Sequence, residues 1–173
     1  MLGAGFGILL RTRGYGLGWA LAMSAFIYAG SMQYVAIDLL TGGASLLTTA
    51  VTTLLVNARH LFYGISMLER YRAAGRYAPY LIFSLTDETY SLVAAREDLT
   101  GAECFRISLL DQLYWVLGTA LGSLAGAYLD FNTTGIDFSL TALFLTVFTE
   151  QWLETKDHAP ALIGLGVSIV CRL

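Results

Sequence analysis

Charged residues are scarce in this sequence. Only 13% of its 173 residues are charged and the formal net charge is −3, whereas soluble domains carry about 25% charged residues. The single lysine is Lys156, so the chain has no basic surface with which to bind nucleic acid. By contrast, 56% of the residues are hydrophobic and the mean hydropathy is +0.63. This balance excludes an ordinary soluble globule and predicts an integral membrane protein in contact with the lipid bilayer.

Cysteine, histidine and proline are also rare. The two cysteines, Cys104 and Cys171, are too far apart to build a disulfide framework, and no second ligand stands at a metal-binding spacing from His60. Lys156 lacks the preceding glycines of a phosphate-binding loop. The sequence also offers no serine–histidine dyad and no facing pair of aspartates for an intramembrane protease. We therefore expect no metal, no cofactor and no enzymatic activity.

Long apolar runs indicate the secondary structure, because a helix that crosses a bilayer needs about 20 mostly apolar residues. Three runs reach this length and a fourth is shorter: 17–40, 44–68, 107–129 and 138–153. The runs at the two ends, 1–10 and 161–173, are incomplete and indicate truncated terminal spans. The sequence thus predicts an all-α, polytopic transmembrane bundle of about five to seven spans. We expect residues 1–173 to form one integral membrane domain.

The loop charges give an orientation, because lysine and arginine favour the cytoplasmic side. Four segments contain basic residues and are assigned to the inside: 11–13, 69–79, 96–106 and 154–158. The segments 41–45 and 130–137 contain none and are assigned to the outside. Two inside loops therefore flank residues 80–95, which predicts a re-entrant or broken hairpin that enters and leaves on one side. The alternative is a short, tilted, ordinary helix.

Two adjacent acids, Asp87 and Glu88, occupy the centre of this short segment. Ionisable residues inside a span cost roughly 2.5–3.5 kcal/mol each, which makes them functional candidates. Neighbouring carboxylates at low dielectric resist being ionised together, so one would hold its proton to higher pH. Such an acid could couple transport to protons or pair with an ammonium group. The alternative places both acids at an interface or at a helix N-terminus, where they favour the helix dipole.

Polar residues also interrupt the first two long runs. Asn57 and His60 are three positions apart and share a helix face, whereas Arg59 points away from them. Arg59 is either a binding residue or a side chain whose long stem reaches the membrane interface. His60 is either a site residue or a hydrogen-bonded core histidine, and Asn57 is typical of contacts between helices. Gln33 lies in mid-span, where an interhelical hydrogen bond is the simpler interpretation.

One helix face is predicted to pack closely. Gly118, Gly122 and Gly126 recur every four residues, and small residues at this spacing let another helix approach. A further group of polar residues lies near expected helix ends. We expect these residues at the membrane interface: Asp38, Asp111, Gln112 and Glu150.

Four stretches of the sequence resemble one known family. They are SAFIYAGSMQYVA (24–36), TTLLVNARHLFYGISMLER (52–70), FSLTDETYSL (83–92) and DQLYWVLGTALG (111–122). Together they resemble the AzlC family of bacterial inner-membrane permeases, and the resemblance covers nearly the whole chain. Members of that family are longer at both ends, which agrees with the truncated terminal runs. The resemblance implies a multi-pass protein that exports branched-chain amino acids together with a small membrane subunit of the AzlD type.

The resemblance and the polar residues together predict a secondary transporter for leucine, isoleucine and valine, with methionine as a further candidate and with coupling to protons. Asp87 or Glu88 would take the substrate ammonium or the coupling proton. Arg59, or the N-terminus of a broken helix, would take the carboxylate. Asn57, His60 and Gln33 would shape the site. Two alternatives remain open, namely a non-transporting membrane scaffold subunit and a channel for cations or small molecules.

Overall fold

The computed structural model describes most of the chain in two compact units, residues 1–133 and 134–173. The described residues are 2–94, 96, 98–128, 135, 138, 141–142, 145, 148–149, 152–153 and 158–170. Each unit is considered by itself. Cys171, Lys156, Glu150 and much of the expected span 138–153 lie outside the described residues.

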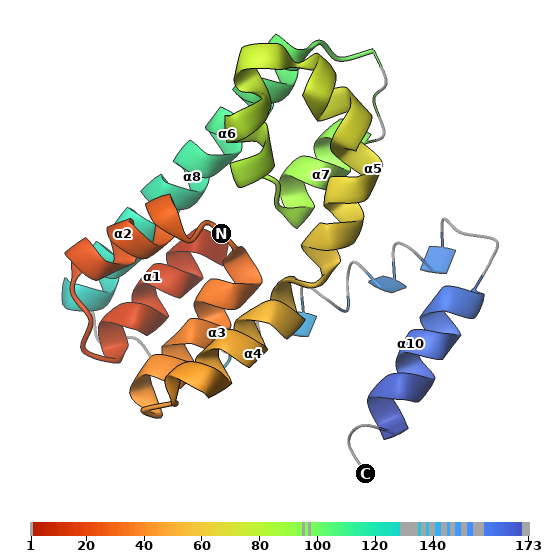
Figure 1. Ribbon diagram of the computed structural model, residues 1–173. Coiled ribbons are helices and arrows are strands. Elements are labelled where there is room, and N and C mark those ends of the chain that lie inside the picture. The colour runs from red at the N-terminus through yellow and green to blue at the C-terminus, as the bar shows by residue number, and fades with distance from the viewer. Residues whose placement is uncertain are drawn as a thin grey trace. The chain divides into compact units, whose positions relative to one another are not determined.

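All regular secondary structure in the described residues is helical, which confirms the predicted all-α class. The helices of the first unit are α1 (Leu2–Thr12), α2 (Leu17–Phe26), α3 (Gly30–Thr41), α4 (Leu46–Asn57), α5 (Arg59–Ala73), the short 3₁₀ turn η1 (Gly75–Tyr77), α6 (Ala78–Phe83), α7 (Asp87–Ala94) and α8 (Gly101–Tyr128) (Figure 1). The second unit contains α10 (Ala159–Val170). Within the described residues, no helix combines the length and the apolar character that a membrane crossing requires.

Helices α1 and α8 form the frame of the first unit and run in the same direction. Gly3 of α1 lies beside Trp115, Gly7 lies beside Thr119, and Arg11 lies beside Gly126. Since α8 has 28 residues, it is about 42 Å long at 1.5 Å per residue. We call the end of the unit where Arg11 meets Gly126 the Arg11 end.

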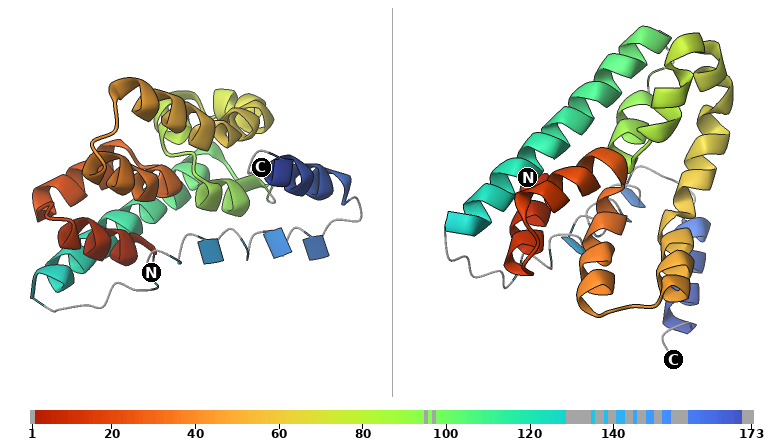
Figure 2. Two further views of the ribbon diagram at one scale, coloured as in Figure 1. Left: turned by 90° about the horizontal axis from the view of Figure 1, so that it is seen from below. Right: turned by 60° about the vertical axis from the view of Figure 1, so that its left-hand side comes forward.

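Helices α2 and α3 form a hairpin that starts from the Arg11 end (Figures 1 and 2). Helix α2 is antiparallel to α8, because Ser24 bonds to Thr119 whereas the later residue Tyr28 bonds to the earlier residue Asp111. The chain reverses at residues 27–29, where Tyr28 has a positive φ of 31°. Helix α3 then turns back, so that the Gln33 side chain reaches Ser24.

Helices α6 and α7 form a second hairpin that starts from the opposite end of the unit. The ring of Tyr77, directly before α6, packs at a tilt against Phe105 in the second turn of α8, with centroids 5.0 Å apart. Helix α7 leads back along α5, and Arg70 of α5 donates hydrogen bonds to the carbonyls of Val93, Arg96 and Leu99. We call this end, where Arg70 and Phe105 lie, the Arg70 end. Within the described residues, 80–94 therefore form a broken hairpin, as one of the two sequence interpretations predicted for 80–95.

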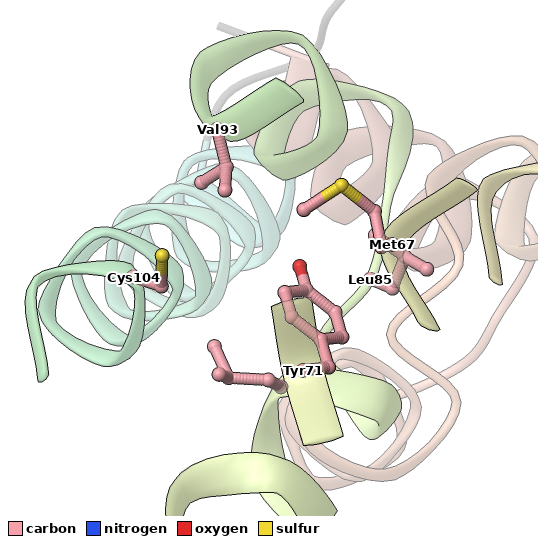
Figure 3. Close-up of a cluster of buried hydrophobic side chains, with 6 residues drawn as sticks. Met67, Tyr71, Leu85, Val93 and Cys104 are labelled. Atoms are coloured by element: carbon pink, nitrogen blue, oxygen red, sulfur yellow. The ribbon is translucent and has the colours of Figure 1, made fainter. Parts of the chain in front are cut away.

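A hydrophobic core holds the second hairpin against α5 and α8. Its buried residues come from α5, α6, α7, α8 and the turn between α6 and α7, and they converge as Figure 3 shows: Met67, Tyr71, Leu81, Leu85, Val93 and Cys104. The exposed fraction of each side chain is 8% or less. Because this cluster joins four helices, the second hairpin is packed along most of its length.

Two of the long apolar runs are not continuous helices, contrary to the sequence prediction. The run 17–40 is divided into α2 and α3, and the run 44–68 is divided into α4 and α5 at Ala58. Apolar composition alone does not distinguish one long helix from a helical hairpin. Helices α1 and α8 end close together, since Gly126 of α8 lies beside Arg11 of α1.

Candidate functional site

Arg59 lies at the centre of the first unit and contacts both hairpins. It is the first residue of α5, directly after the break at Ala58. Its Nη1 atom forms an ion pair with the Asp87 carboxylate at the start of α7. Its Nη2 atom donates a hydrogen bond to Ser31 Oγ at the start of α3. Both terminal nitrogens of Arg59 therefore have partners within the first unit.

The position of Asp87 is set by a local hydrogen-bond pattern in the turn between α6 and α7. Thr86 stands before the first residue of α7, and its Oγ1 atom accepts a hydrogen bond from the Thr89 backbone N–H at 3.3 Å. The Thr89 hydroxyl in turn accepts from the Thr86 N–H at 2.8 Å. This reciprocal cap fixes the start of the helix. Asp87 and Glu88 are therefore the first two residues of α7, where negative charge favours the dipole.

Aromatic and polar side chains surround the ion pair. Tyr63 lies one turn after Arg59 and Tyr90 lies one turn after Asp87, and their rings stack with centroids 4.4 Å apart. His60 contacts the Asn57 carbonyl at 3.3 Å and meets the Tyr63 ring edge-on. Among the described residues, Asn57 Oδ1 and Asp87 Oδ1 are buried atoms without a hydrogen-bond partner. These two oxygen atoms could therefore accept a hydrogen bond from a donor group of a ligand.

A second side chain, Gln112 of α8, also bonds to both hairpins. Its amide nitrogen donates to the Ala25 carbonyl near the end of α2 at 3.2 Å. Its amide oxygen accepts from the Tyr80 hydroxyl of α6 at 2.7 Å. The neighbouring Asp111 accepts from the Tyr28 hydroxyl at 2.7 Å. The expectation that Asp111 and Gln112 lie near a helix end is wrong, because α8 begins at Gly101 and both residues are well inside it.

Gln33 belongs to a separate polar cluster. Its side chain is fully buried, and its amide oxygen accepts from Trp115 Nε1 at 2.8 Å. Its amide nitrogen donates to Ser24 Oγ, which donates in turn to Thr119 Oγ1 at 2.9 Å. Gln33 therefore joins α3 to α2 and α8 by interhelical hydrogen bonds, and none of these contacts involves Arg59 or Asp87.

The glycine face of α8 packs on α1. A Cβ atom on Gly122 would lie 2.0 Å from the Ala4 carbonyl oxygen, and one on Gly126 would lie 3.3 Å from Arg11 Cβ. Gly118 faces the same helix, with the Ala4 nitrogen 3.4 Å from its Cβ position. Gly3 and Gly7 supply small residues from the α1 side. This face is thus occupied within the chain.

The structure brings some of the predicted site residues together and separates others. Arg59 and Asp87 are in direct contact, and Asn57 and His60 flank Arg59 in the sequence at the same break. Glu88 is directed toward Thr86 and lies within electrostatic reach of Asp111 and Tyr28, apart from the Arg59 pair. Sequence reasoning missed Ser31, Tyr28 and Gln112. The Thr100–Glu103 capping pattern, which marks the true start of α8, would have shown that Gln112 is not terminal.

The arrangement presents one cation and one anion side by side at the meeting point of two helical hairpins. A ligand with an anionic and a cationic group could exchange with this pair, bonding to Arg59 and to Asp87. The fold and the site thus define a helical protein with discontinuous helices and buried helix starts. In transporters, ligand sites commonly lie at such helix breaks.

The chain belongs to the AzlC family, whose model, described as AzlC protein, matches residues 1–129. It is 46% identical to the branched-chain amino acid transport protein AzlC of Bacillus subtilis, over 97% of this chain and 68% of that protein. It is 43% identical to an uncharacterized membrane protein of Helicobacter pylori, over 99% and 77%. It is 29% identical to the inner membrane protein YgaZ of Escherichia coli, over 92% and 70%. No solved structure matches the chain.

Proposed function

We propose that this protein is a secondary transporter that exports branched-chain amino acids across the bacterial inner membrane. The family supports transport, because a relative that is 46% identical is named a branched-chain amino acid transport protein. The ion pair between Arg59 and Asp87 is the observation that supports a substrate site at particular residues. An amino acid is a zwitterion and needs one partner of each charge, which this pair supplies.

In this proposal the first unit is multi-pass and its Arg70 end faces the cytoplasm. The Arg70 end carries five arginines, whereas the Arg11 end carries two. The arginines of the Arg70 end are Arg70, Arg72, Arg76, Arg96 and Arg106, and those of the Arg11 end are Arg11 and Arg13. The excess of basic residues favours the cytoplasmic side for the Arg70 end.

Substrate binding exchanges the partners of the ion pair. The substrate carboxylate bonds to Arg59 and to the free backbone N–H groups at the start of α3, while its ammonium group bonds to Asp87. The stacked rings of Tyr63 and Tyr90 lie one turn along from the pair and offer an apolar surface to a branched side chain. Asn57 and His60 border the same break, and Gln33 maintains the shape of the adjoining α2–α3 hairpin.

The coupling proton is assigned to Glu88. Asp87 is neutralised by Arg59, whereas Glu88 has two neighbouring acids, Asp87 and Asp111, and no basic residue as a partner in the described structure. A carboxyl in that position gains from being protonated. The Tyr28 hydroxyl donates a hydrogen bond to Asp111 and lies within electrostatic reach of Glu88.

The test is leucine efflux from proteoliposomes that contain this protein and a small AzlD-type subunit, with and without an imposed pH gradient. We expect saturable efflux that the gradient accelerates. Asp87→Asn should raise the KM for leucine about 10- to 100-fold, the factor for losing a hydrogen-bonded charge. Glu88→Gln should retain leucine exchange between equal pools but lose its response to the gradient.

The matched control is Asp98→Asn, because the Asp98 side chain is 76% exposed and pairs only loosely with Arg96. This variant should leave both KM and the gradient response unchanged. If Asp87→Asn and Glu88→Gln also leave both properties intact, the assigned mechanism is wrong. Absence of leucine efflux from a folded preparation under every gradient would overturn the transport proposal for this substrate.

The scaffold alternative is tested in the same system by omitting one component. Its main support was the glycine face of α8, which α1 covers in the structure. If the small subunit alone moves leucine as fast as the pair does, the present chain is only a scaffold. A channel would instead show efflux that does not saturate with leucine.

A further inference from the structure

The two helical hairpins of the first unit approach each other from opposite ends. The α2–α3 hairpin starts from the Arg11 end, and the α6–α7 hairpin starts from the Arg70 end (Figures 1 and 2). Their turns meet near the middle of α8, where the rings of Tyr28 and Phe83 lie with centroids 6.4 Å apart. Neither hairpin passes through the unit from one end to the other.

Two side chains outside the hairpins each bond to both of them. Arg59 of α5 bonds to the second helix of each hairpin, through Ser31 of α3 and Asp87 of α7. Gln112 of α8 bonds to the first helix of each hairpin, through the Ala25 carbonyl of α2 and the Tyr80 hydroxyl of α6. Each bridging side chain therefore has one partner in the α2–α3 hairpin and one in the α6–α7 hairpin. One bridging residue is a charged arginine and the other is a neutral glutamine.

We propose that the α2–α3 and α6–α7 hairpins are two opposing gates, and that Arg59 and Gln112 hold both gates closed. The proposal rests on the transport function proposed above. Opening the α2–α3 gate breaks the bonds to Ser31 and the Ala25 carbonyl, together with the bonds of that hairpin to α8 through Ser24, Tyr28 and Gln33. Opening the α6–α7 gate breaks the bonds to Asp87 and Tyr80 and withdraws Leu85 from the hydrophobic core. Each bridging side chain keeps its other partner, so one gate opens while the opposite gate stays closed.

The rest of the unit provides a fixed frame for this movement. The close packing of α1 on α8 leaves no space for a Cβ atom at Gly7 or Gly122. Arg70 holds the far end of α7 on α5 through the Val93 carbonyl at 2.6 Å. The α6–α7 hairpin is thus held at its base, and its turn, which carries Asp87, is the part that separates. Ser31 and Tyr80 are positioning residues in this scheme, since each acts through a bridging side chain.

A bound zwitterion would loosen one gate specifically. When a substrate carboxylate bonds to Arg59, the attraction between Arg59 and Asp87 is shared with a second anion. The substrate ammonium also competes for Asp87, so the α6–α7 gate loses attraction at both ends of its closing bond, whereas the substrate carboxylate competes only at the Arg59 end of the bond to Ser31. Occupancy of the site therefore biases which gate opens. A ligand shifts a conformational equilibrium only when it interacts differently with the two conformations.

The experiment measures how fast a thiol at each turn reacts with a membrane-impermeant reagent added from either side. Ala29→Cys reports on the α2–α3 turn and Ser84→Cys on the α6–α7 turn, in full-length protein in which Cys104 and Cys171 are replaced by alanine. Ser84 is fully buried and Ala29 is half-buried, so both thiols should react slowly. The readout needs no substrate, which separates a failure here from a failure of the transport proposal.

Two single-hydroxyl deletions provide the matched comparison. Ser31→Ala should speed the labelling of Ala29→Cys about tenfold, the factor for losing a hydrogen bond to a charged group, and only from the Arg11 end. Tyr80→Phe should speed the labelling of Ser84→Cys severalfold, and only from the Arg70 end. Ser31→Thr keeps the hydroxyl and should leave the rate at Ala29→Cys unchanged.

The effect of each hydroxyl deletion on the labelling of the opposite turn distinguishes two separate gates from one concerted opening. Ser31→Ala should not change labelling at Ser84→Cys, and Tyr80→Phe should not change labelling at Ala29→Cys. Equal acceleration at both turns in both variants would show one concerted opening and overturn the proposal of separate gates. Unchanged rates in monodisperse protein would show that the bridging bonds do not close the hairpins, which also overturns it.

Discussion

Gly122 of α8 and Ala4 of α1 are in backbone contact. A Cβ atom placed on Gly122 would lie 2.0 Å from the Ala4 carbonyl oxygen and 2.7 Å from its Cα atom. Such distances are shorter than any normal packing contact, so the two helices approach at a point that only glycine permits. The recurrence of glycine at every fourth position of α8 therefore reflects the position of α1 rather than a free docking face.

Replacing Gly122 by alanine should weaken the frame of the first unit. The added methyl group meets backbone atoms, which cannot rotate away, so α1 must shift. We expect a loss of about 1–3 kcal/mol, the range for overpacking a tight core. Thermal unfolding in detergent would measure it. Gly64→Ala is the control, because nothing lies within 4 Å of that Cβ position. It should be neutral or stabilising by up to about 1 kcal/mol. Equal losses in both variants would contradict the close approach.

Tyr71→Phe should not weaken the core around α5. The Tyr71 ring is buried among Met67, Val93 and Cys104, and its hydroxyl oxygen points into the cluster (Figure 3). That oxygen is buried without a hydrogen-bond partner in the described structure. Removing an unsatisfied polar atom costs nothing and can stabilise, by about 1 kcal/mol. Tyr71→Ala should instead cost about 3–5 kcal/mol, because it leaves a cavity. A clear drop in the melting temperature of Tyr71→Phe would indicate a hydrogen bond to that hydroxyl.

The all-α class and the broken hairpin at 80–95 could be predicted from the sequence. The run around Asp87 was too short for a span and had basic loops on both sides, which indicated the reversal. The hairpin at 17–41 carried no such signal. Its run is long and mostly apolar, and although Gln33 lies in mid-span, no charge or proline marks the turn at residues 27–29. Only the positive φ of Tyr28 and the contacts of both helices with α8 show that the chain reverses there.

Half of the candidate site was predictable for a similar reason. Arg59 and Asp87 stood out because charges are rare in apolar runs. Their contact could not be predicted, since the two residues are 28 positions apart and no sequence pattern relates the start of α5 to the start of α7. Ser31 and Gln112 carry no charge and resemble many other polar residues of the chain. Their role depends on the meeting of two hairpins, which is a property of tertiary packing.

Arg59 and Asp87 should show strong energetic coupling. Their side chains are 25% and 28% exposed, so the pair is largely shielded from water. Removing one partner leaves the other charge poorly solvated, whereas removing both does not. The double variant Arg59→Met/Asp87→Asn should therefore be more stable than the sum of the single losses predicts, with a coupling of about 1–3 kcal/mol.

The matched cycle for this pair uses Arg96 and Asp98. Their nitrogen and oxygen atoms are 3.8 Å apart, and both side chains are more than half exposed. The coupling energy of this pair should be close to zero, as for most surface ion pairs. Chemical unfolding of the eight proteins of the two cycles would give both values. Similar coupling energies for the two pairs would indicate that Arg59 and Asp87 do not interact in the folded protein.

Glu103 should make the start of α8 sensitive to acid. Its carboxylate accepts hydrogen bonds from the Thr100 hydroxyl at 2.7 Å and from the Thr100 backbone N–H at 2.8 Å. These bonds lower the pKa of the Glu103 carboxyl below its ordinary value of 4.5. Because the folded-state pKa is the lower one, the stabilising contribution is complete above the unfolded-state pKa. It is lost as the pH falls through the folded-state pKa.

Glu103→Gln removes this titration and keeps an acceptor oxygen, so it is the informative variant. At pH 7 the variant should melt at a lower temperature than the parent protein, because an amide oxygen is a weaker acceptor than a carboxylate at a helix N-terminus. The difference between the two melting temperatures should stay nearly constant down to about pH 4.5 and shrink toward zero at lower pH, since only the parent loses its charge. Melting curves of both proteins across this range provide the measurement. A difference that stays constant with pH would mean that the cap does not act through the charge of Glu103.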